Sequence, residues 1–395
     1  SKLSFNDQDT YLGIYPTVYK KVDKNDISVV PFQVYKTWTV LSGSSTSSAL
    51  PLQGMYTNPD YLPALGSELT YNDAKNVDDS LQTITYYSIN HNFYKNKRNL
   101  YSTVGSNSPN FEKYLYVSAS ILSFPYIKVG ESTKNIQQVS DEVIAALNNA
   151  SFTILGQYNP EGKSNLKVIV FTNTELKNTV VKITDRGALA AAYKVGLIAK
   201  DGKVTISYTN PDYILRAYLG NNYNSFKSVF EKFSKDVKNA LTAVGNEFKP
   251  FGGSVQEDDL KKYHYKIMMP YFTDPVELNE YASFEEGLKT IENNLKAKKG
   301  QTVEVYKIVY ADKKIAVFGV GLQSKEDGES VFLPIIGEDH IAAMPYEIIL
   351  QGKEATMLHG KYRIALHWPE LTMGTFMKIM STPGNIEDTL EAVCE

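Results

Sequence analysis

The sequence has few residues of the types that carry chemistry: one cysteine, Cys394, and five histidines among 395 residues. A single cysteine excludes an intrachain disulfide and a cysteine metal cluster. No run of about 18 apolar residues occurs, so we expect no membrane-spanning helix. The first residues, Ser1–Asp7, lack the apolar core of a signal peptide. We therefore expect a soluble protein, cytoplasmic or virion-associated; a signal peptide removed by processing would leave no trace in this chain.

Basic residues are neither in excess nor concentrated. Lys and Arg number 41 against 44 Asp and Glu, which gives a formal net charge of −3. The densest basic clusters, Lys95–Arg98 and Lys296–Lys299, are typical of solvated loops or helix ends. A protein that binds a phosphate backbone normally carries a concentrated basic face. We expect no nucleic-acid partner.

Tyrosine, in contrast, is abundant and unevenly distributed. Residues 1–130 hold 14 of the 28 tyrosines, whereas seven of the eight methionines follow residue 130. This shift predicts a domain boundary near Gly130–Lys134. Runs of strand-forming residues over Ile27–Leu41 and Leu81–Tyr87 predict that residues 1–130 form a mainly-β domain. Its Tyr, Ser and Asn side chains supply contact area that suits protein partners or self-association.

Two segments of this first part resemble segments of tailed-phage structural proteins. They are the stretch Tyr86-Tyr87-Ser88-Ile89-Asn90-His91-Asn92-Phe93-Tyr94 and the stretch from Tyr116 to Pro125. The resemblance covers residues 1–130 and includes no catalytic motif. It implies a role in virion assembly, of the tail or baseplate type.

From residue 131 onward the hydrophobic pattern predicts alternating helices and strands, and therefore an α+β fold. Apolar residues at helical spacing predict helices over Ile136–Ala150, Tyr223–Val244 and Phe284–Lys296. Apolar runs and turn residues predict strands over Phe152–Tyr158, Leu166–Thr172, Ala192–Ala199, Lys203–Thr209, Thr302–Tyr310, Lys314–Gly321, Tyr346–Gln351 and Tyr362–His367.

The order of these predicted elements repeats. Ala192–Ile198 aligns with Pro345–Gln351, and Val204–Asp212 aligns with Tyr362–Glu370, so a strand, a turn, a strand and a helix occur twice. The period is too long for a solenoid. We interpret residues 131–250 and 251–395 as a duplicated α+β module, a pseudo-dimer of hairpin-helix units within one chain. Chance similarity between two such units is the alternative.

The second part also resembles the bacterial domain-of-unknown-function family 302. The resemblance is carried by Ser151–Gly156, Val195–Ile198, Val204–Ser207 and the Asn210-Pro211 that follows. It covers residues 135–220 well and 283–393 more loosely. It implies a compact α+β domain that dimerises, with no established reaction. Members often carry a Pro-Cys pair before the hairpin, where this chain has Ala192-Tyr193 and Pro345-Tyr346, so any role of that cysteine is in doubt here.

One polar group of the second copy is a candidate site. Strand alternation would place Arg363 and His367 on one face, opposite Glu347 on the preceding strand, with His340 nearby. Histidine with a carboxylate could bind a metal or move a proton. We favour a buried salt bridge with a hydrogen-bonded core histidine over this catalytic or metal-binding interpretation.

No motif for a cofactor is complete, and we expect neither a cofactor nor a metal. The loop before Gly162-Lys163-Ser164 has the wrong spacing for a phosphate-binding loop, and Gly-x-Ser-x-Gly is absent. The stripe Met373, Met377 and Met380 has the spacing of core-filling residues on a helix. We therefore favour a non-enzymatic binding or assembly protein. The alternatives are a phage virion component and an enzyme or metal-binding protein using Glu347, Arg363 and His367.

Overall fold

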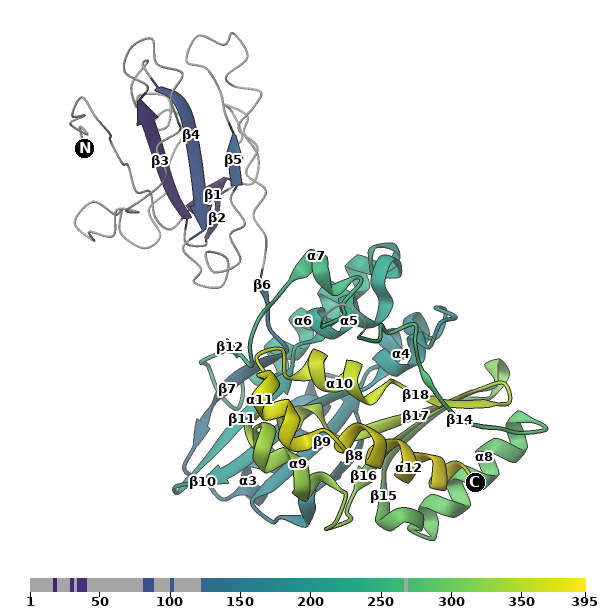
Figure 1. The fold of residues 1–395 in the computed structure, drawn as a ribbon. Coiled ribbons are helices and arrows are strands. Elements are labelled where there is room, and N and C mark those ends of the chain that lie inside the picture. The colour runs from purple at the N-terminus through teal and green to yellow at the C-terminus, as the bar shows by residue number, and fades with distance from the viewer. Residues whose placement is uncertain are drawn as a thin grey trace. The chain divides into compact units, whose positions relative to one another are not determined.

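The structure, a computed structural model (Figure 1), describes residues 122–265 and 269–395 and five short strands that precede them. The chain divides into two units, Ser1–Ser120 and Ile121–Glu395. In the first unit β1 pairs with β2, while β3, β4 and β5 form an antiparallel sheet. These five strands span Thr17–Tyr19, Val29–Pro31, Val34–Val40, Leu81–Ser88 and Leu100–Ser102.

Most predictions for the N-terminal part concern residues outside the described ones. Strand β3 lies within the predicted run Ile27–Leu41, and β4 covers the predicted run Leu81–Tyr87 and one further residue. The predictions of a mainly-β domain, a phage resemblance and a partner surface over residues 1–130 rest on residues outside the described ones. The second unit starts upstream of the expected position 131, because Tyr126–Ser132 forms β7, an interior strand of its first sheet.

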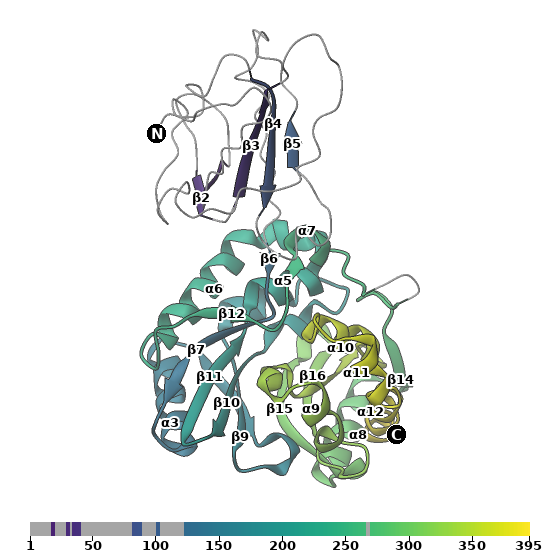
Figure 2. The same cartoon turned by 60° about the vertical axis from the view of Figure 1, so that its left-hand side comes forward.

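The first sheet of the second unit is antiparallel, with the strand order β12-β7-β11-β10-β9-β8. Helices α3 and α6 pack against each other, and α3 covers one face of β8, β9 and β10 (Figure 2). The Asn135 side chain caps α3, which buries Val139, Val143 and Leu147. The elements are β7, α3 (Ile136–Asn149), β8 (Thr153–Tyr158), β9 (Leu166–Thr172), α4 (Thr174–Val180), the 3-10 helix η4 (Gly187–Ala191), β10 (Tyr193–Lys200), β11 (Lys203–Thr209), α5 (Pro211–Leu219), α6 (Lys227–Leu241) and β12 (Lys249–Phe251).

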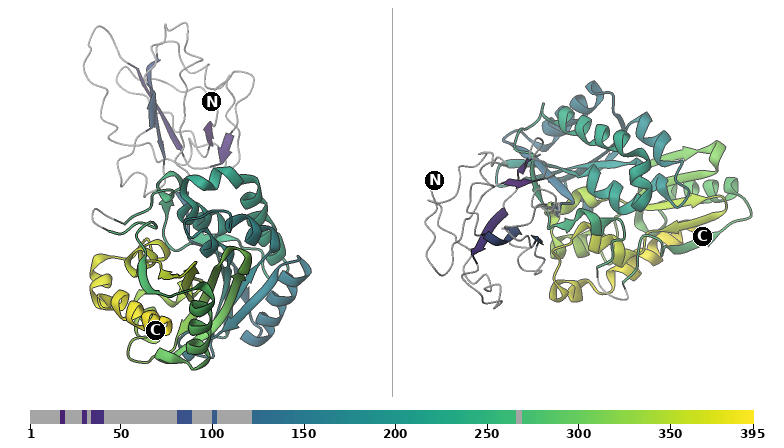
Figure 3. Two further views of the ribbon diagram at one scale, coloured as in Figure 1. Left: turned by 90° about the vertical axis from the view of Figure 1, so that its right-hand side faces the viewer. Right: turned by 90° about the horizontal axis from the view of Figure 1, so that it is seen from above.

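The second sheet is also antiparallel, with the order β14-β18-β17-β16-β15. Helices α8 and α12 pack together, and α12 ends the chain beside β14 (Figure 3). The elements are β14 (Val276–Glu280), α8 (Phe284–Lys296), β15 (Thr302–Tyr310), β16 (Ile315–Leu322), α9 (Glu329–Ile336), the 3-10 helix η8 (Glu338–Ala343), β17 (Tyr346–Gln351), β18 (Glu354–Met357), α10 (Gly360–His367), α11 (Met373–Phe376), the 3-10 helix η9 (Met377–Ile379) and α12 (Thr382–Cys394). The smaller elements are β6 (Leu122–Ser123), η3 (Pro160–Gly162), η5 (Gly220–Phe226), β13 (Val255–Gln256), α7 (Glu257–Leu260), η6 (Lys299–Gln301) and η7 (Ala311–Lys313).

The two sheets follow the same order of elements. Apart from the single-turn helices η3, η6 and η7, each half runs strand, helix, two strands, helix, 3-10 helix, two strands and helix, from β7 to α5 and from β14 to α10. Each of two corresponding strand pairs also carries one extra, unpaired residue. These residues are Val129 in β7 and Leu278 in β14, and Leu155 in β8 and Val305 in β15. Such bulges kink a strand at one defined place, so they fix where each sheet bends.

The two halves meet at these bent edges. Strand β8 of the first sheet contacts β15 of the second. A Cβ atom at Gly156, next to the bulge in β8, would lie 1.8 Å from the carbonyl oxygen of Val305, the bulge residue of β15. Glycine at position 156 is therefore required by the close approach of two backbones. On the other side, η8 of the second half packs against β10 and β11 of the first.

The α+β prediction for the second part is confirmed, including the hairpin β10–β11 and the helix α3. The predicted strand Tyr362–His367 is wrong, because these residues form α10. Every residue from Tyr362 to His367 is buried, so the helix lacks the polar face that would have revealed its period. The strand that follows β17 and pairs with it is β18, which lies between the two predicted strands Tyr346–Gln351 and Tyr362–His367.

The methionine stripe is also placed differently from the prediction. Met373, Met377 and Met380 are 50%, 57% and 61% exposed, so they do not fill the core. Met373 lies in α11, Met377 in η9, and Met380 directly after η9, so these single turns have no continuous helical face to bury. In the described part of the chain, no helix is both long enough and apolar enough to cross a membrane.

Candidate functional site

A buried ionic cluster lies between the two halves. Lys194 is the second residue of β10, and Glu347 is the second residue of β17. The Lys194 Nζ atom lies 2.5 Å from Oε1 of Glu347, and Nε of Arg363 in α10 lies 3.3 Å from Oε2 of Glu347. The exposed fractions of the three residues are 8%, 6% and 1%. One carboxylate is therefore shared by two buried cations.

Arg363 is held by further contacts. Its Nη2 atom donates hydrogen bonds to the carbonyl oxygens of Ala343 and of Pro345, the latter at 2.6 Å. Its guanidinium group lies 3.9 Å from the ring centroid of Tyr346. These contacts hold α10 against the start of β17 and fix the orientation of the Arg363 guanidinium group toward the Glu347 carboxylate.

Burial and the neighbouring charges have opposite effects on the pKa values of the two cations in the cluster. Burial lowers the pKa of Lys194, and Glu347 opposes that shift. Burial also opposes the charge of Arg363, but Glu347 and the surrounding tyrosines together raise its pKa above its usual value. Arg363 keeps its proton, so the cluster can hold charge in place but cannot pass a proton through the guanidinium.

A second polar group adjoins the cluster. Arg363 and His367 are four residues apart in α10, which places them on the same helix face. The Nδ1 atom of His367 lies 2.9 Å from the hydroxyl oxygen of Tyr126 in β7. Burial, followed by the charges of Arg363 and Lys194, lowers the pKa of His367 well below its usual value. His367 is therefore a neutral, hydrogen-bonded core histidine.

His340 of η8 completes this group. Its ring packs 4.8 Å from Tyr126 and 5.4 Å from Trp368, measured between centroids. Its Nε2 atom lies 3.8 Å from Oδ2 of Asp339 and 3.7 Å from Oε1 of Glu370, both beyond hydrogen-bond length. Burial lowers the pKa of His340 as well.

The structure brings the four predicted residues, Glu347, Arg363, His367 and His340, into one region, although by a helix and not by the expected strand. Sequence reasoning missed Lys194 and Tyr126. A signal for Lys194 was present, because aligning Ala192–Ile198 with Pro345–Gln351 sets Lys194 opposite Glu347. Two opposite charges at one aligned position are what a pairing of the copies around a two-fold axis would bring together.

A cavity opens beside this region, at the junction of the two halves. Its volume is about 670 Å³. The first half contributes residues of β7, β10, β11 and β12, and the second half contributes α9 and η8. Phe251 lines it and packs on the rings of Tyr126 and His340. The lining residues are Lys128, Ile198, Lys200, Thr205, Lys249, Phe251, Pro334, Glu338 and Asp339.

Metal binding and thiol chemistry are two further candidates in the described residues. No group of three His, Cys, Asp or Glu side chains there is arranged to hold a metal ion. Cys394 is buried in α12, and its carbonyl oxygen accepts hydrogen bonds from Asn279 and Tyr281. Burial raises the pKa of its thiol to about 12, so a nucleophilic thiolate is not formed near neutral pH.

These residues thus define a class of protein, an α+β fold of two antiparallel sheets with a buried ionic cluster at their junction. Residues 129–244 match the family model described as "Domain of unknown function DUF302". A solved structure described as an uncharacterized conserved protein DUF302 from Bacillus stearothermophilus is 13% identical, with a TM-score of 0.26, and the similarity covers 32% of this chain and 98% of that chain. No curated protein matches. The predicted family 302 resemblance is confirmed for the first half; for residues 283–393 it stays a prediction.

Proposed function

We propose that this chain is a non-enzymatic binding protein. Its second unit would contain two copies of one α+β domain, which pack against each other as two subunits do in a homodimer. Both halves have the same order of elements. Bulges at four corresponding positions support common descent more strongly, because their placement is not dictated by the fold class. Val129 and Leu278 occupy one pair of positions, and Leu155 and Val305 the other.

Reciprocal contacts across the junction support pairing around a two-fold axis. The Tyr213 hydroxyl of α5 donates to the Leu366 carbonyl of α10 at 2.8 Å, and the Tyr362 hydroxyl of α10 donates to the Ala217 carbonyl of α5 at 3.4 Å. Tyr213 and Tyr362 are each the third residue of their helix, and both acceptors lie four residues further on. This reciprocity is the pattern of an isologous dimer interface.

The Lys194–Glu347–Arg363 cluster is then the polar centre of an internal interface. Lys194 and Glu347 occupy equivalent positions in the two copies. In a symmetric dimer the same residue would occupy both positions, and two like charges would repel each other; here the opposite charges attract. Burial of all three residues supports a structural role over the catalytic or metal-binding alternative for Glu347, Arg363 and His367.

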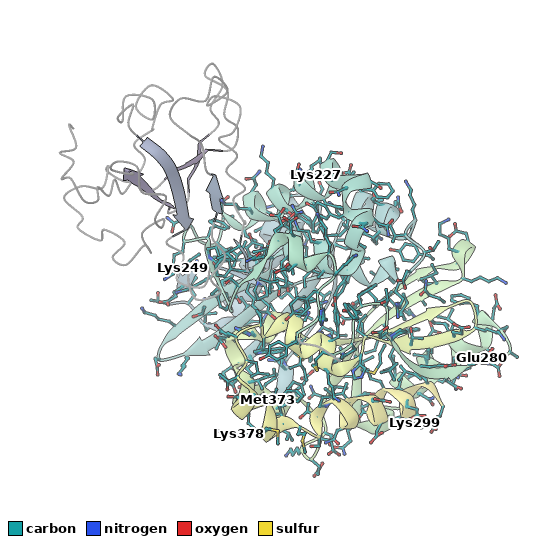
Figure 4. The ribbon with its side chains drawn as sticks, turned by 45° about the horizontal axis from the view of Figure 1, so that its top comes forward. Lys227, Lys249, Glu280, Lys299, Met373 and Lys378 are labelled. Atoms are coloured by element: carbon teal, nitrogen blue, oxygen red, sulfur yellow. The ribbon has the colours of Figure 1, made fainter. Side chains whose placement is uncertain are left out.

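One observation supports binding above the others: both halves line the junction cavity. Ligand sites occur preferentially at such domain interfaces. Lys128 is paired with Glu131 and Glu247, and Glu338 with Lys163. Lys200 and Lys249 have no ion pair with another described residue; Lys249 is labelled in Figure 4. We therefore assign a small anion to this cavity. Protein contacts through the Tyr-rich residues 1–130, and a virion role, remain predictions supported by composition and resemblance.

Titration calorimetry with citrate and with inorganic phosphate tests this assignment. The variant Lys200→Glu/Lys249→Glu should bind either anion at least about 10-fold more weakly than the unmodified chain, because each substitution turns attraction into repulsion at short range. The variant Lys378→Glu, which changes an exposed lysine outside the cavity, is the control and should bind normally. Equal affinity in the two variants, or no binding of either anion by the unmodified chain, would contradict the proposal.

A further inference from the structure

A second, smaller cavity lies on the second half, apart from the junction. Its volume is about 180 Å³. One side is a face of α10, because Lys361, Ile364, Ala365 and Trp368 follow one another at spacings of three, one and three residues. The remaining lining residues are Tyr265, Met269, Leu371, Thr372, Met373 and Phe376. The hydroxyl of Tyr265 donates to the Leu371 carbonyl oxygen at 3.3 Å.

The lining is mainly apolar, and its polar residues are Tyr265, Thr372 and Lys361. Lys361 is the sole charged residue among the lining residues. It lies in the first turn of α10 and is exposed, and no ion pair joins it to another described side chain. An apolar wall with a single cation at its edge is complementary to a molecule with an apolar body and one negative charge.

The surface around the cavity extends this apolar wall. Met373 lines the cavity and is 50% exposed, and Met377, on the following turn, is 57% exposed. Figure 4 shows Met373 and Lys378 on these C-terminal turns. Val331 and Ile335 of α9, the helix that contacts α11 and η9, are also exposed. Methionine side chains adapt to different apolar shapes, so they suit a mobile chain more than a rigid ring system.

We propose that this cavity binds the alkyl chain of an anionic amphiphile, with its head group at Lys361. The cavity is smaller than the roughly 300–1,000 Å³ of pockets for drug-sized ligands, which favours one unbranched chain. The chain beyond the cavity would lie along the exposed methionines. A free medium-chain carboxylate and an anionic lipid at a membrane surface share this chemistry. The proposal is independent of the anion site at the junction, with which the cavity shares no lining residue.

Tryptophan fluorescence offers a local test. The sequence has two tryptophans, Trp38 and Trp368, and only Trp368 lines the cavity. In the full chain with Trp38→Phe, brominated decanoate should quench Trp368 fluorescence in a saturable manner. Lys361→Glu in that background should weaken binding at least about 10-fold, and Lys361→Gln should weaken it less. Lys378→Glu makes the same charge change on an exposed lysine outside the cavity and should leave the affinity within twofold.

Two arms distinguish the sources of the ligand. Quenching by free brominated decanoate below its micelle concentration identifies a free carboxylate. Quenching only by vesicles of brominated phosphatidylglycerol identifies a membrane lipid, and either result supports the anionic amphiphile. Absence of quenching in both arms overturns the proposal, as does equal weakening by Lys361→Glu and Lys378→Glu. Decanol binding as tightly as decanoate would show that Lys361 does not select the charge and would also overturn it.

Discussion

Glu347→Gln is expected to lower the free energy of unfolding of the second unit by about 3–5 kcal/mol. The substitution keeps the shape of the side chain but removes its charge and replaces one acceptor oxygen with a donor NH2 group. Lys194 and Arg363 would then be two buried cations without a counter-charge, in a site where Glu347 lies within 3.3 Å of both. Neither cation can reach water, because their exposed fractions are 8% and 1%.

Lys194→Met should cost much less, on the order of 1 kcal/mol. Glu347 keeps its pair with Arg363, and burial already opposes the charge on Lys194. The ranking of the two variants is therefore the informative result. If the cluster acted only through packing, Glu347→Gln, which keeps the shape of its side chain, would cost less than Lys194→Met, which shortens its side chain.

Urea unfolding followed by Trp368 fluorescence in the Trp38→Phe background would measure this ranking, since Trp368 reports on the second unit. Lys307→Gln is the matched control. It breaks a 2.6 Å pair with Glu292 whose side chains are 33% and 37% exposed, and it should cost less than about 1 kcal/mol. A loss for Glu347→Gln no larger than that of the control would refute the account of the cluster.

Local patterns predicted much of the second part. The hairpin β10–β11 was predicted from its turn residues, Lys200-Asp201-Gly202, and α3 from its apolar spacing. In these segments one face is buried and the other is exposed, so apolar residues recur in the sequence with the period of the helix or strand. The helix α10 has no such contrast, because Tyr362–His367 is buried on every side.

The candidate site was predicted through the wrong secondary structure. Arg363 and His367 share a face at a spacing of four in a helix and also in a strand, so the grouping survived the error. The partners Lys194 and Tyr126 were missed for a different reason. Tyr126 is 241 residues from His367 in sequence, and the tyrosine-rich composition had assigned it to another domain. Contacts at such separation depend on how the two sheets pack, which no local pattern records.

Glu329 gives the second large prediction, a change in the pH dependence of stability. Its side chain, at the start of α9, is fully buried. Its Oε1 atom accepts hydrogen bonds from the Tyr158 hydroxyl at 2.8 Å and from the Leu322 amide at 3.2 Å, and its Oε2 atom accepts one from the Glu161 amide at 3.0 Å. These bonds favour the charged carboxylate, yet burial outweighs them and raises the pKa of Glu329 to about 7.

A carboxyl group whose pKa is higher in the folded state binds its proton more tightly there than in the unfolded chain. Its contribution therefore favours folding at low pH and is lost as the pH rises from the usual value of 4.5 to about 7. Between pH 5 and pH 8 the unmodified chain should lose roughly 2–3 kcal/mol that Glu329→Gln does not lose. The amide has one acceptor atom fewer, so the variant should also carry a pH-independent cost of about 1 kcal/mol.

Comparison of the two proteins at each pH is needed because His367 acts in the opposite sense. Its pKa is lowered by burial, so its contribution is present above its unfolded value and is lost as the pH falls. That term is common to both proteins and cancels in the difference. We expect Glu329→Gln to be no more stable than the unmodified chain at pH 5 and more stable at pH 8, so that the two plots of unfolding free energy against pH meet near pH 5. Parallel pH profiles would mean that Glu329 titrates as an ordinary exposed carboxyl group and that its burial beneath Tyr158 does not govern its charge.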